Sequence, residues 1–536
     1  MTHRPRVVII GGGFSGYNAA RVLNRKHRRE IDVTLLNPTD FMLYEPLLPD
    51  VVAGIVHPRH VAVSLAAALP YTRLLPGTVT GLDADQREVR YVDSEGRSRQ
   101  VGYDRLIVSV GAVNMVLPIE GSQTYSHGLK GLPEALYLRD HVIRQVELAA
   151  AAEDPEEQRA RLTFVVVGAG YTGTETAAVG QLFTRSLLRK YRSLAGVPVR
   201  WVVVQYDDRL LPELRPPLGR TAERVLRKRG AELRLGTTVR KAAPDGVLLS
   251  DGEFVPARTI VWATGVRPDP VIDAFGLPTV GGRIQTDEFM AVSGHPEIYA
   301  AGDAAAVPDL AGPGEITPMT GQHAERHGAA VARNVAASLG LGRGAKPYRH
   351  RLLGFLVDLG GWQAAADPLG VPLSGVAAKL VTRGYHLYVM PGNRIRVAAD
   401  WLLDAVLPRQ VVQLGLVRGD AVPLDSPDPE LPRRVYPTRS PQGKRARTDA
   451  HTVLGARDPQ DGWQQHFADT YKEGYGLGDP AMIQILIREA PDAVRELSDW
   501  GTPFSRLPSR ARAKSPPPPT APWAAWSSTP RPTPPT

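Results

Sequence analysis

Two glycine-rich segments in this chain have the residue types and spacing that bind a pyrophosphate. The first follows an apolar run, Arg6–Ile10, and reads Gly11-Gly12-Gly13-Phe14-Ser15-Gly16 before a helical stretch. In the pattern G-x-G-x-x-G, the first glycine permits a tight turn and the second lets the backbone approach the pyrophosphate. The third lets the helix pack closely on the strand, and the helix N-terminus attracts the phosphates. The segment therefore predicts a dinucleotide site.

The second segment repeats this arrangement. The apolar run Thr163–Val167 leads into Gly168-Ala169-Gly170-Tyr171-Thr172-Gly173 and another helical stretch. Buried parallel strands have such continuous apolar runs. Two units in one chain predict two dinucleotides, and the obvious pair is FAD with NADH or NADPH.

The residue that ends the second strand of each unit departs from the usual pattern. An acidic residue is expected there to bond the ribose hydroxyls, but the chain has Asn37 and Gln205. Asn37 keeps an acceptor oxygen without the charge. Near Gln205, Arg209 favours NADPH whereas Asp207 disfavours it, so both nicotinamide cofactors stay open.

Two later segments fit the same architecture. Thr259–Val266 is an apolar strand that contains Ala-Thr-Gly at its end, and Glu297–Ala304 is a strand with Gly-Asp leading to a predicted helix. Asp303 could cap that helix. Together with the other motifs, it is better explained as an acceptor for the FAD ribitol.

Composition excludes several kinds of chemistry. The 536 residues include no cysteine, which excludes disulfides, thiolate metal sites and cysteine nucleophiles, and no metal site is expected. The net charge of +9 has no nucleic-acid motif beside it, and no run is apolar enough for a membrane span. A strand that begins almost at Met1 predicts no signal peptide and a cytoplasmic location.

The order of these motifs resembles the type II NADH:quinone oxidoreductases, which are single-subunit respiratory NADH dehydrogenases. The similarity covers about residues 5–424 and rests on these segments: Gly11–Gly16, Leu43–Pro49, Gly168–Glu175, Trp262–Val266, Ala301–Asp303, Thr320–Ala324 and the region of Trp401. The resemblance implies an α/β fold with two Rossmann-like domains, the NAD(P) domain being inserted into the FAD domain, and a small C-terminal α+β domain.

The resemblance also implies roles for individual residues. FAD is expected on Gly11, Gly13, Phe14, Ser15, Gly16, Asn37, Gly111 and Asp303. The nicotinamide nucleotide is expected on Gly168, Gly170, Gly173, Gln205 and Gly265. Hydride would pass from nicotinamide to flavin and electrons then to a quinone, without proton pumping, the cofactor performing the chemistry.

Four residues are assigned to the catalytic centre or the acceptor side. Glu175 matches the family's acidic residue near flavin and nicotinamide, and Gln322 matches a glutamine beside flavin and quinone. Arg326 replaces a second glutamine of the family, and Arg383 lies where a basic residue is common. Because of such departures, a soluble reductase with another acceptor and a slow flavin-binding sensor or scaffold remain alternatives.

A basic, Trp-containing apolar stretch, Asp400–Val417, suits an interfacial helix. The resemblance implies that this region docks on the membrane, and the inner face of the cell membrane is the expected location. A core helix is the alternative, and the sequence is compatible with a homodimer.

The predicted organisation is 1–125 (FAD, first part), 126–270 (NAD(P)H), 271–345 (FAD, second part), 346–424 (C-terminal acceptor-side domain) and 425–452 (linker).

Beyond the linker the sequence changes character. Residues 453–506 resemble a fragment of the succinate dehydrogenase/fumarate reductase flavoprotein subunit without its glycine fingerprint, so the fragment is expected to be inactive alone. Residues 507–536 are proline-rich and predicted to be disordered. A truncated fusion explains this end best, and a docking module is the alternative.

Overall fold

The computed structural model describes residues 4–424 except 313 and 351, together with 505–506 and 526–527. The chain forms two compact units, Met1–Leu431 and Pro432–Thr536. In the second unit, β26 (Ser505–Arg506) pairs antiparallel with β27 (Trp526–Ser527). The predictions made for the linker, for the flavoprotein fragment and for the tail otherwise lie outside the described residues.

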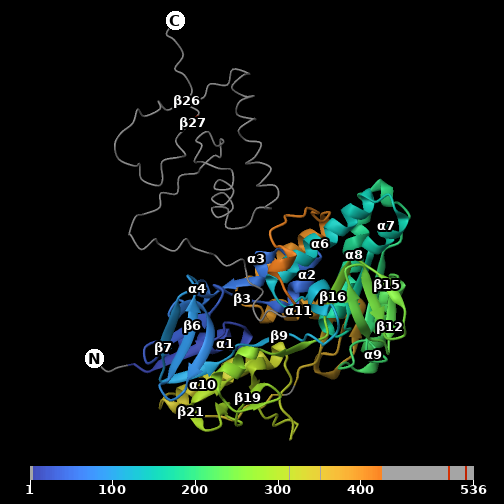
Figure 1. Cartoon of the computed structure of the whole chain (residues 1–536). Coiled ribbons are helices and arrows are strands. Elements are labelled where there is room, and N and C mark those ends of the chain that lie inside the picture. The colour runs from blue at the N-terminus through green and yellow to red at the C-terminus, as the bar shows by residue number, and fades with distance from the viewer. Residues whose placement is uncertain (1–3, 313, 351, 425–504, 507–525, 528–536) are drawn as a thin grey trace. The chain divides into compact units, whose positions relative to one another are not determined.

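The first unit contains an eight-stranded sheet whose five central strands are parallel. The sheet order is β20 (Ala291–Val292), β21 (His295–Ala300), β8 (Arg105–Val108), β1 (Arg6–Ile10), β2 (Asp32–Asn37), β5 (Arg73–Asp83), β6 (Glu88–Asp93) and β7 (Ser98–Gly102). In β1 the residues Val7–Ile10 are at most 1% exposed, as the apolar run predicted. Helices α1 (Phe14–His27) and α10 (Gly321–Ser338) pack side by side against this sheet, although they are far apart in sequence (Figure 1).

A second, four-stranded parallel sheet is built between the two parts of the first. Its order is β12 (Ala231–Leu235), β11 (Arg200–Gln205), β10 (Thr163–Val167) and β16 (Thr259–Trp262). The surrounding helices are α6 (Leu132–Ala151), α7 (Pro155–Arg161), α8 (Tyr171–Leu188) and α9 (Pro216–Lys228), and a small antiparallel sheet is formed by β13 (Val239–Ala243), β14 (Gly246–Leu249) and β15 (Phe254–Pro256). The chain crosses between the two large sheets through β9 (Ala112–Asn114) and β17 (Val266–Pro268), which pair antiparallel. The predicted fold class, with one Rossmann-like unit inserted into the other, is confirmed.

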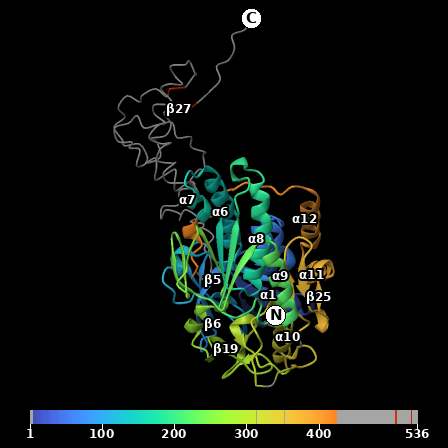
Figure 2. The same cartoon turned by 90° about the vertical axis from the view of Figure 1, so that its right-hand side faces the viewer.

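A small α+β region follows. It consists of β23 (Leu356–Asp358), β24 (Ala364–Ala366), β25 (Leu373–Ser374), α11 (Gly375–Val389) and α12 (Arg394–Val406). Figure 2 shows α11 and α12 together along one edge of the first unit. The remaining short elements are β3 (Phe41–Leu43), η1 (Glu45–Leu47), α2 (Leu48–Val52), α3 (Pro58–Val61), β4 (Ala62–Ser64), α4 (Leu65–Ala68), α5 (Ser122–Tyr125), η2 (Arg192–Leu194), η3 (Pro270–Phe275), β18 (Thr279–Val280), β19 (Arg283–Gln285), η4 (Gly302–Ala304), β22 (Ala305–Ala306), η5 (Pro368–Gly370) and η6 (Gly419–Ala421).

Two local expectations were wrong. The stretch after Gly302-Asp303 forms the single turn η4 and then β22, because Ala305 and Ala306 pair with β19 instead of starting a helix. The helix expected over Asp400–Val417 ends at Val406. Pro408 explains this end, since proline disfavours helical geometry in the residue before it.

Candidate active site

The two glycine turns have nearly the same geometry. Gly11 has φ +91° and Gly168 has φ +96°, a region that favours glycine. A Cβ on Gly16 would lie 1.8 Å from the Gly11 carbonyl oxygen, and one on Gly173 would lie 1.9 Å from that of Gly168. By contrast, a Cβ on Gly13 or Gly170 would meet no protein atom within 4 Å. The middle glycines thus face open space, as a turn that receives a pyrophosphate requires.

The side chains that end the second strands tie down these turns. Asn37 Oδ1 accepts a hydrogen bond from the Gly12 amide at 2.6 Å. Gln205 Oε1 accepts one from the Ala169 amide at 2.7 Å, and its Nε2 donates to Asp207 Oδ2 at 2.6 Å. Asn37 and Gln205, which replace the usual acidic residue, therefore have the same structural role. Each amide side chain fixes the glycine loop beside it.

A cavity of about 580 Å³ opens above the first turn. Among the predicted FAD residues, those that line it are Gly11, Gly13, Phe14, Ser15, Asn37, Gly111 and Asp303. Gly16 lies behind the turn, where α1 contacts β1. The Ser15 hydroxyl is buried and has no hydrogen-bond partner among the described residues. An orphaned donor at a helix N-terminus, beside an open glycine, fits a phosphate ligand.

The far side of this cavity holds a charged group that the sequence did not indicate. Lys130 Nζ bonds Glu45 Oε2 at 2.5 Å, and both residues line the cavity with Asp303. Burial raises the pKa of the Asp303 carboxyl, while the positive charge of Lys130 opposes this rise. For Lys130, burial lowers the pKa, but Glu45 and Asp303 outweigh this effect and the net shift is upward. A lone lysine in a loop has no spacing signal by which it could have been found.

A largely buried cluster with more carboxylates than cations joins the inserted unit to the C-terminal region. Glu175 on α8 accepts a hydrogen bond from the Asp358 amide at 2.8 Å. Lys379, 2% exposed on α11, donates to Asp358 Oδ1 at 2.5 Å and also bonds Oδ2. Burial raises the pKa of Glu175 well above its usual range, and the negative charges of Asp358 and Asp50 add to the shift. Only Glu175 of this cluster was predicted.

Asp50 connects this cluster to α12. The Trp401 indole nitrogen donates to Asp50 Oδ2 at 2.9 Å, and both side chains are buried. Burial and the negative charge of Asp358 raise the pKa of Asp50 to about 6, although Lys379 opposes the shift. Trp401 therefore belongs to the core, as the alternative of a core helix expected, whereas Leu402, Leu403 and Val406 of the same helix are exposed.

This raised pKa predicts the effect of Asp50→Asn on stability. The folded carboxyl binds its proton more tightly than the unfolded one, so ionisation costs stability as pH rises from 3.8 to about 6. The asparagine side chain does not ionise, so it has no such cost. Its amide oxygen can still accept the hydrogen bond from the Trp401 indole nitrogen. We expect the variant to gain about 1–3 kcal/mol in unfolding free energy at pH 7.5 and little at pH 4, measured by urea unfolding.

The exposed Asp85 provides the control for this experiment, since Asp85→Asn should change stability at neither pH. A variant at Asp50 that loses stability equally at both pH values would contradict the assignment of an unfavourable buried charge.

The remaining predicted residues lie on α10 and α11. Gln322 bridges to the C-terminal region, where its Nε2 donates to the Gly354 carbonyl at 2.7 Å and its Oε1 accepts from the Leu353 amide at 3.2 Å. Arg326 Nη1 donates to the Gln322 carbonyl at 3.0 Å. The Arg383 guanidinium lies 4.9 Å from the centre of the Trp401 ring, in cation–π contact.

A tyrosine–histidine pair closes the space between α11 and the first glycine turn. The Tyr44 hydroxyl lies 3.0 Å from His386 Nδ1, and the Tyr44 ring is 5.6 Å from that of Phe14. Burial lowers the pKa of His386 to about 4, so the imidazole is neutral at pH 7. The predicted residues thus lie in the two glycine turns, at the strand ends and in η4 beside them, on α8 and α10, and, for Arg383, on α11.

Comparison with known proteins agrees with this geometry. The family described as pyridine nucleotide-disulphide oxidoreductase matches residues 5–328, and the one described as FAD binding domain matches residues 449–532. The chain is 30% identical over 412 residues to the type II NADH:quinone oxidoreductase NdhA of Mycobacterium tuberculosis, covering 74% of this chain and 86% of that protein. It is 26% identical to an internal alternative NAD(P)H-ubiquinone oxidoreductase of Solanum tuberosum mitochondria, covering 77% and 88%.

A solved structure has the same fold. NDH2 from Plasmodium falciparum in complex with NADH superposes with a TM-score of 0.71 at 18% identity, covering 76% of this chain and all of that one. The second family match, at residues 449–532, includes the whole segment 453–506 for which the sequence indicated a second flavoprotein family.

Proposed function

Since this chain belongs to the type II NADH:quinone oxidoreductases, within the pyridine nucleotide-disulphide oxidoreductase family, we propose the residues by which it performs that reaction. It is an FAD-dependent enzyme that oxidises NADH and reduces a quinone without pumping protons. FAD held by these residues would supply the chemistry that takes up hydride from the nicotinamide and delivers electrons to the quinone. The observation that supports the residue roles is the cavity of about 580 Å³ between the first glycine turn and Asp303.

In this proposal FAD is held by the residues that line the cavity. Amides at the start of α1, beyond Gly12, and the free Ser15 hydroxyl donate to the pyrophosphate, and Asn37 accepts from the ribose. Asp303 accepts from the ribitol hydroxyls, since its carboxylate faces the same cavity. Gly111, at φ +83°, lets the backbone approach the cofactor without a side chain between them.

The second turn binds the nicotinamide nucleotide through Gly168, Gly170, Gly173 and Gly265, and we propose a preference for NADH over NADPH. The Asp207 carboxylate lies 2.6 Å from Gln205 Nε2, where it would repel a 2′-phosphate. The Arg209 guanidinium keeps its positive charge, but its Nη2 donates to the Pro212 carbonyl, which leaves fewer of its N–H groups for a 2′-phosphate.

On the acceptor side, the cluster formed by Glu175, Asp50, Asp358 and Lys379 holds protons. Quinone reduction consumes protons as well as electrons, and Glu175 and Asp50 both have raised pKa values. Lys379 keeps the cluster from holding several uncompensated negative charges. Gln322 positions the loop at Leu353–Gly354 beside α10, Arg326 bonds the Gln322 carbonyl, and Arg383 fixes α11 against Trp401.

We also propose a peripheral contact with the inner face of the membrane. No helix in the described ranges is long and apolar enough to cross a bilayer. The exposed apolar side chains that support a contact are Leu402, Leu403, Val406, Leu407, Val412, Leu414 and Leu416. We expect the protein to float with liposomes and Leu403→Glu/Val406→Glu to weaken this binding; equal flotation would contradict the proposed contact.

One assay tests the redox function and its alternatives. NADH should bleach the flavin absorption of the purified protein faster than NADPH does, and a short-chain quinone should restore it. Bleaching without reoxidation by quinone would favour a soluble reductase with another acceptor. Absence of bleaching would favour a flavin-binding sensor or scaffold.

A further inference from the structure

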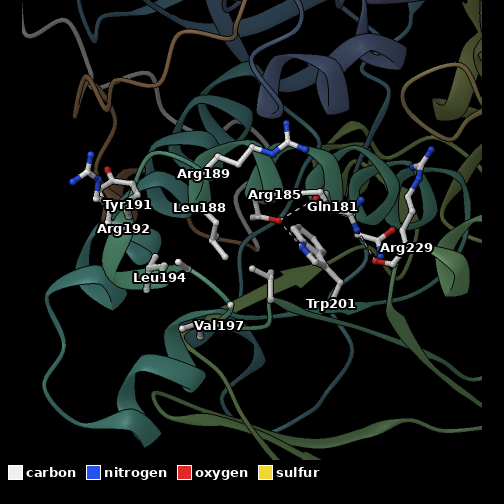
Figure 3. A pocket seen from close by; sticks show the side chains of 14 residues that line it. Gln181, Arg185, Leu188, Arg189, Tyr191, Arg192, Leu194, Val197, Trp201 and Arg229 are labelled. Carbon is white, nitrogen blue, oxygen red and sulfur yellow. Dashed lines mark hydrogen bonds between the residues drawn. The ribbon is translucent and has the colours of Figure 1, made fainter.

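A second cavity, of about 480 Å³, lies in the inserted unit away from both glycine turns. It is bounded by the C-terminal half of α8, by η2 and by Trp201 of β11 (Figure 3). It shares no lining residue with the cavity above the first turn. Its volume is in the range of ligand-binding pockets, and nothing in the redox reaction accounts for it.

The rim of this cavity is strongly positive. Four arginines line it and no acidic residue does. Arg185, Arg189 and Arg192 are exposed, and none of them forms an ion pair with a carboxylate in the described part of the chain. The surrounding stretch, 176–206, contains five basic residues and no acidic one. Such a concentration of unpaired guanidinium groups favours a phosphate-bearing ligand.

The interior of the cavity is apolar. Figure 3 shows Leu188 and Trp201 on either side of the hollow, with the Arg189 and Arg192 side chains extending outward at its edges. The polar edge of Trp201 is already used, since its indole nitrogen donates to Thr184 Oγ1 at 3.1 Å. The ligand therefore needs an apolar portion beside its anionic group.

One buried polar atom in the wall lacks a partner. Gln181 is 5% exposed, and its Nε2 donates to the Leu226 carbonyl at 3.3 Å. This bond fixes the orientation of the amide. Its Oε1 is buried and accepts no hydrogen bond from any described residue. Because an unsatisfied buried acceptor is costly, this oxygen points to a ligand that brings a hydroxyl donor.

We propose that this cavity binds one anionic phospholipid whose headgroup carries hydroxyls, as phosphatidylglycerol does. The phosphate lies among Arg185, Arg189 and Arg192, and the glycerol and first acyl carbons pack between Leu188 and Trp201. A headgroup hydroxyl donates to Gln181 Oε1. The site is separate from the redox centre, so the proposal does not depend on the acceptor being a quinone.

The exposed apolar segment beside the rim favours a lipid over a soluble nucleotide as the ligand. Lys190 Nζ is 3.4 Å from the Arg409 carbonyl, so the segment after α12 passes next to the cavity. In that segment Leu407, Val412, Leu414 and Leu416 are each 58–63% exposed. An acyl chain that leaves the cavity would therefore meet apolar surface, whereas a nucleotide would gain nothing from it.

The test measures binding of monomeric dihexanoyl phosphatidylglycerol to the full-length, FAD-loaded protein by calorimetry. We expect dihexanoyl phosphatidylcholine to bind at least about tenfold more weakly. Arg189→Glu/Arg192→Glu should weaken phosphatidylglycerol binding by at least about tenfold. The matched control is Arg220→Glu/Arg224→Glu, which reverses two exposed arginines on α9 outside the cavity and should leave affinity unchanged.

Two further arms identify the ligand class. Ala195→Trp places a large side chain in the cavity without changing charge and should also abolish lipid binding. Inorganic phosphate and ADP should not displace the lipid at equal concentration. Displacement by either, equal affinity for the two lipids, or equal loss in the control variant would overturn the proposal. An unchanged flavin spectrum in every variant excludes misfolding as the cause.

Discussion

Replacing Gly170 with valine is expected to leave a folded, yellow protein whose flavin NADH no longer bleaches. A side chain at this position meets no protein atom within 4 Å, so the fold has room for it. The same side chain occupies the space in which the second glycine of the motif admits the pyrophosphate. Displacing the nucleotide by about 1 Å is enough to lower the rate about 100-fold or more.

The measurement is stopped-flow reduction of the flavin at increasing NADH concentration, with flavin content determined first. Gly13→Val is the matched variant, because Gly13 has the equivalent position in the first turn and is equally open. That variant should be purified without FAD. Normal bleaching of the Gly170 variant, or loss of FAD from it, would show that the two turns do not divide the cofactors as proposed.

Replacing Lys379 with methionine is expected to be the most destabilising change of a charged residue considered. Lys379 is 2% exposed, bonds Asp358, and lowers the pKa values of Glu175 and Asp50 by its positive charge. Its removal leaves Asp358 without its bonded cation, and Arg383 as the other positive charge that acts on Asp50, which costs about 3–5 kcal/mol. Reoxidation of the flavin by quinone should slow in the same variant, because the proton-holding cluster is disturbed.

The loss of unfolding free energy in the Lys379→Met variant should increase with pH. Without Lys379 the pKa values of Glu175 and Asp50 rise further, so the folded state binds more protons than the unfolded one over a wider range. Stability then falls as pH rises through that range, and the deficit is larger at pH 8 than at pH 5. Urea unfolding at both pH values measures it.

The control for Lys379 is Lys241→Met, which removes an exposed ion pair with Glu120 and should leave the unfolding free energy almost unchanged, because solvent screens that pair. Asp358→Asn in the Lys379 variant should restore part of the lost stability. Equal unfolding midpoints for the Lys379 and Lys241 variants would refute the role given to the buried lysine.

The parts of the fold that the sequence predicted are those specified by local pattern. Arg6–Ile10 and Thr163–Val167 are strands with the predicted bounds, because continuous apolar runs next to glycine turns specify buried parallel strands. The glycine motifs located both nucleotide turns for the same reason. Each motif contains its own geometric requirement within six residues.

The parts that escaped prediction depend on contacts between distant residues. Asp50 and Trp401 are 351 positions apart, and Glu175 and Asp358 are 183 apart. No spacing rule relates such pairs, so Asp50, Asp358 and Lys379 could be recognised only in the folded chain. The burial of Trp401 could not be derived from the sequence either, because a basic amphipathic pattern fits both a membrane surface and a core-facing helix.

The C-terminal region holds both nucleotide-binding units at once. It reaches the inserted unit through Asp358 and Glu175, and the first unit through Tyr44–His386 and Asp50–Trp401. The relative placement of the two glycine turns is thus set partly by a third element of the chain. A protease cut within residues 375–406 would accordingly disturb both glycine turns, although neither turn lies in the cut segment. Reduction of the flavin by NADH and its reoxidation by quinone would then be lost together.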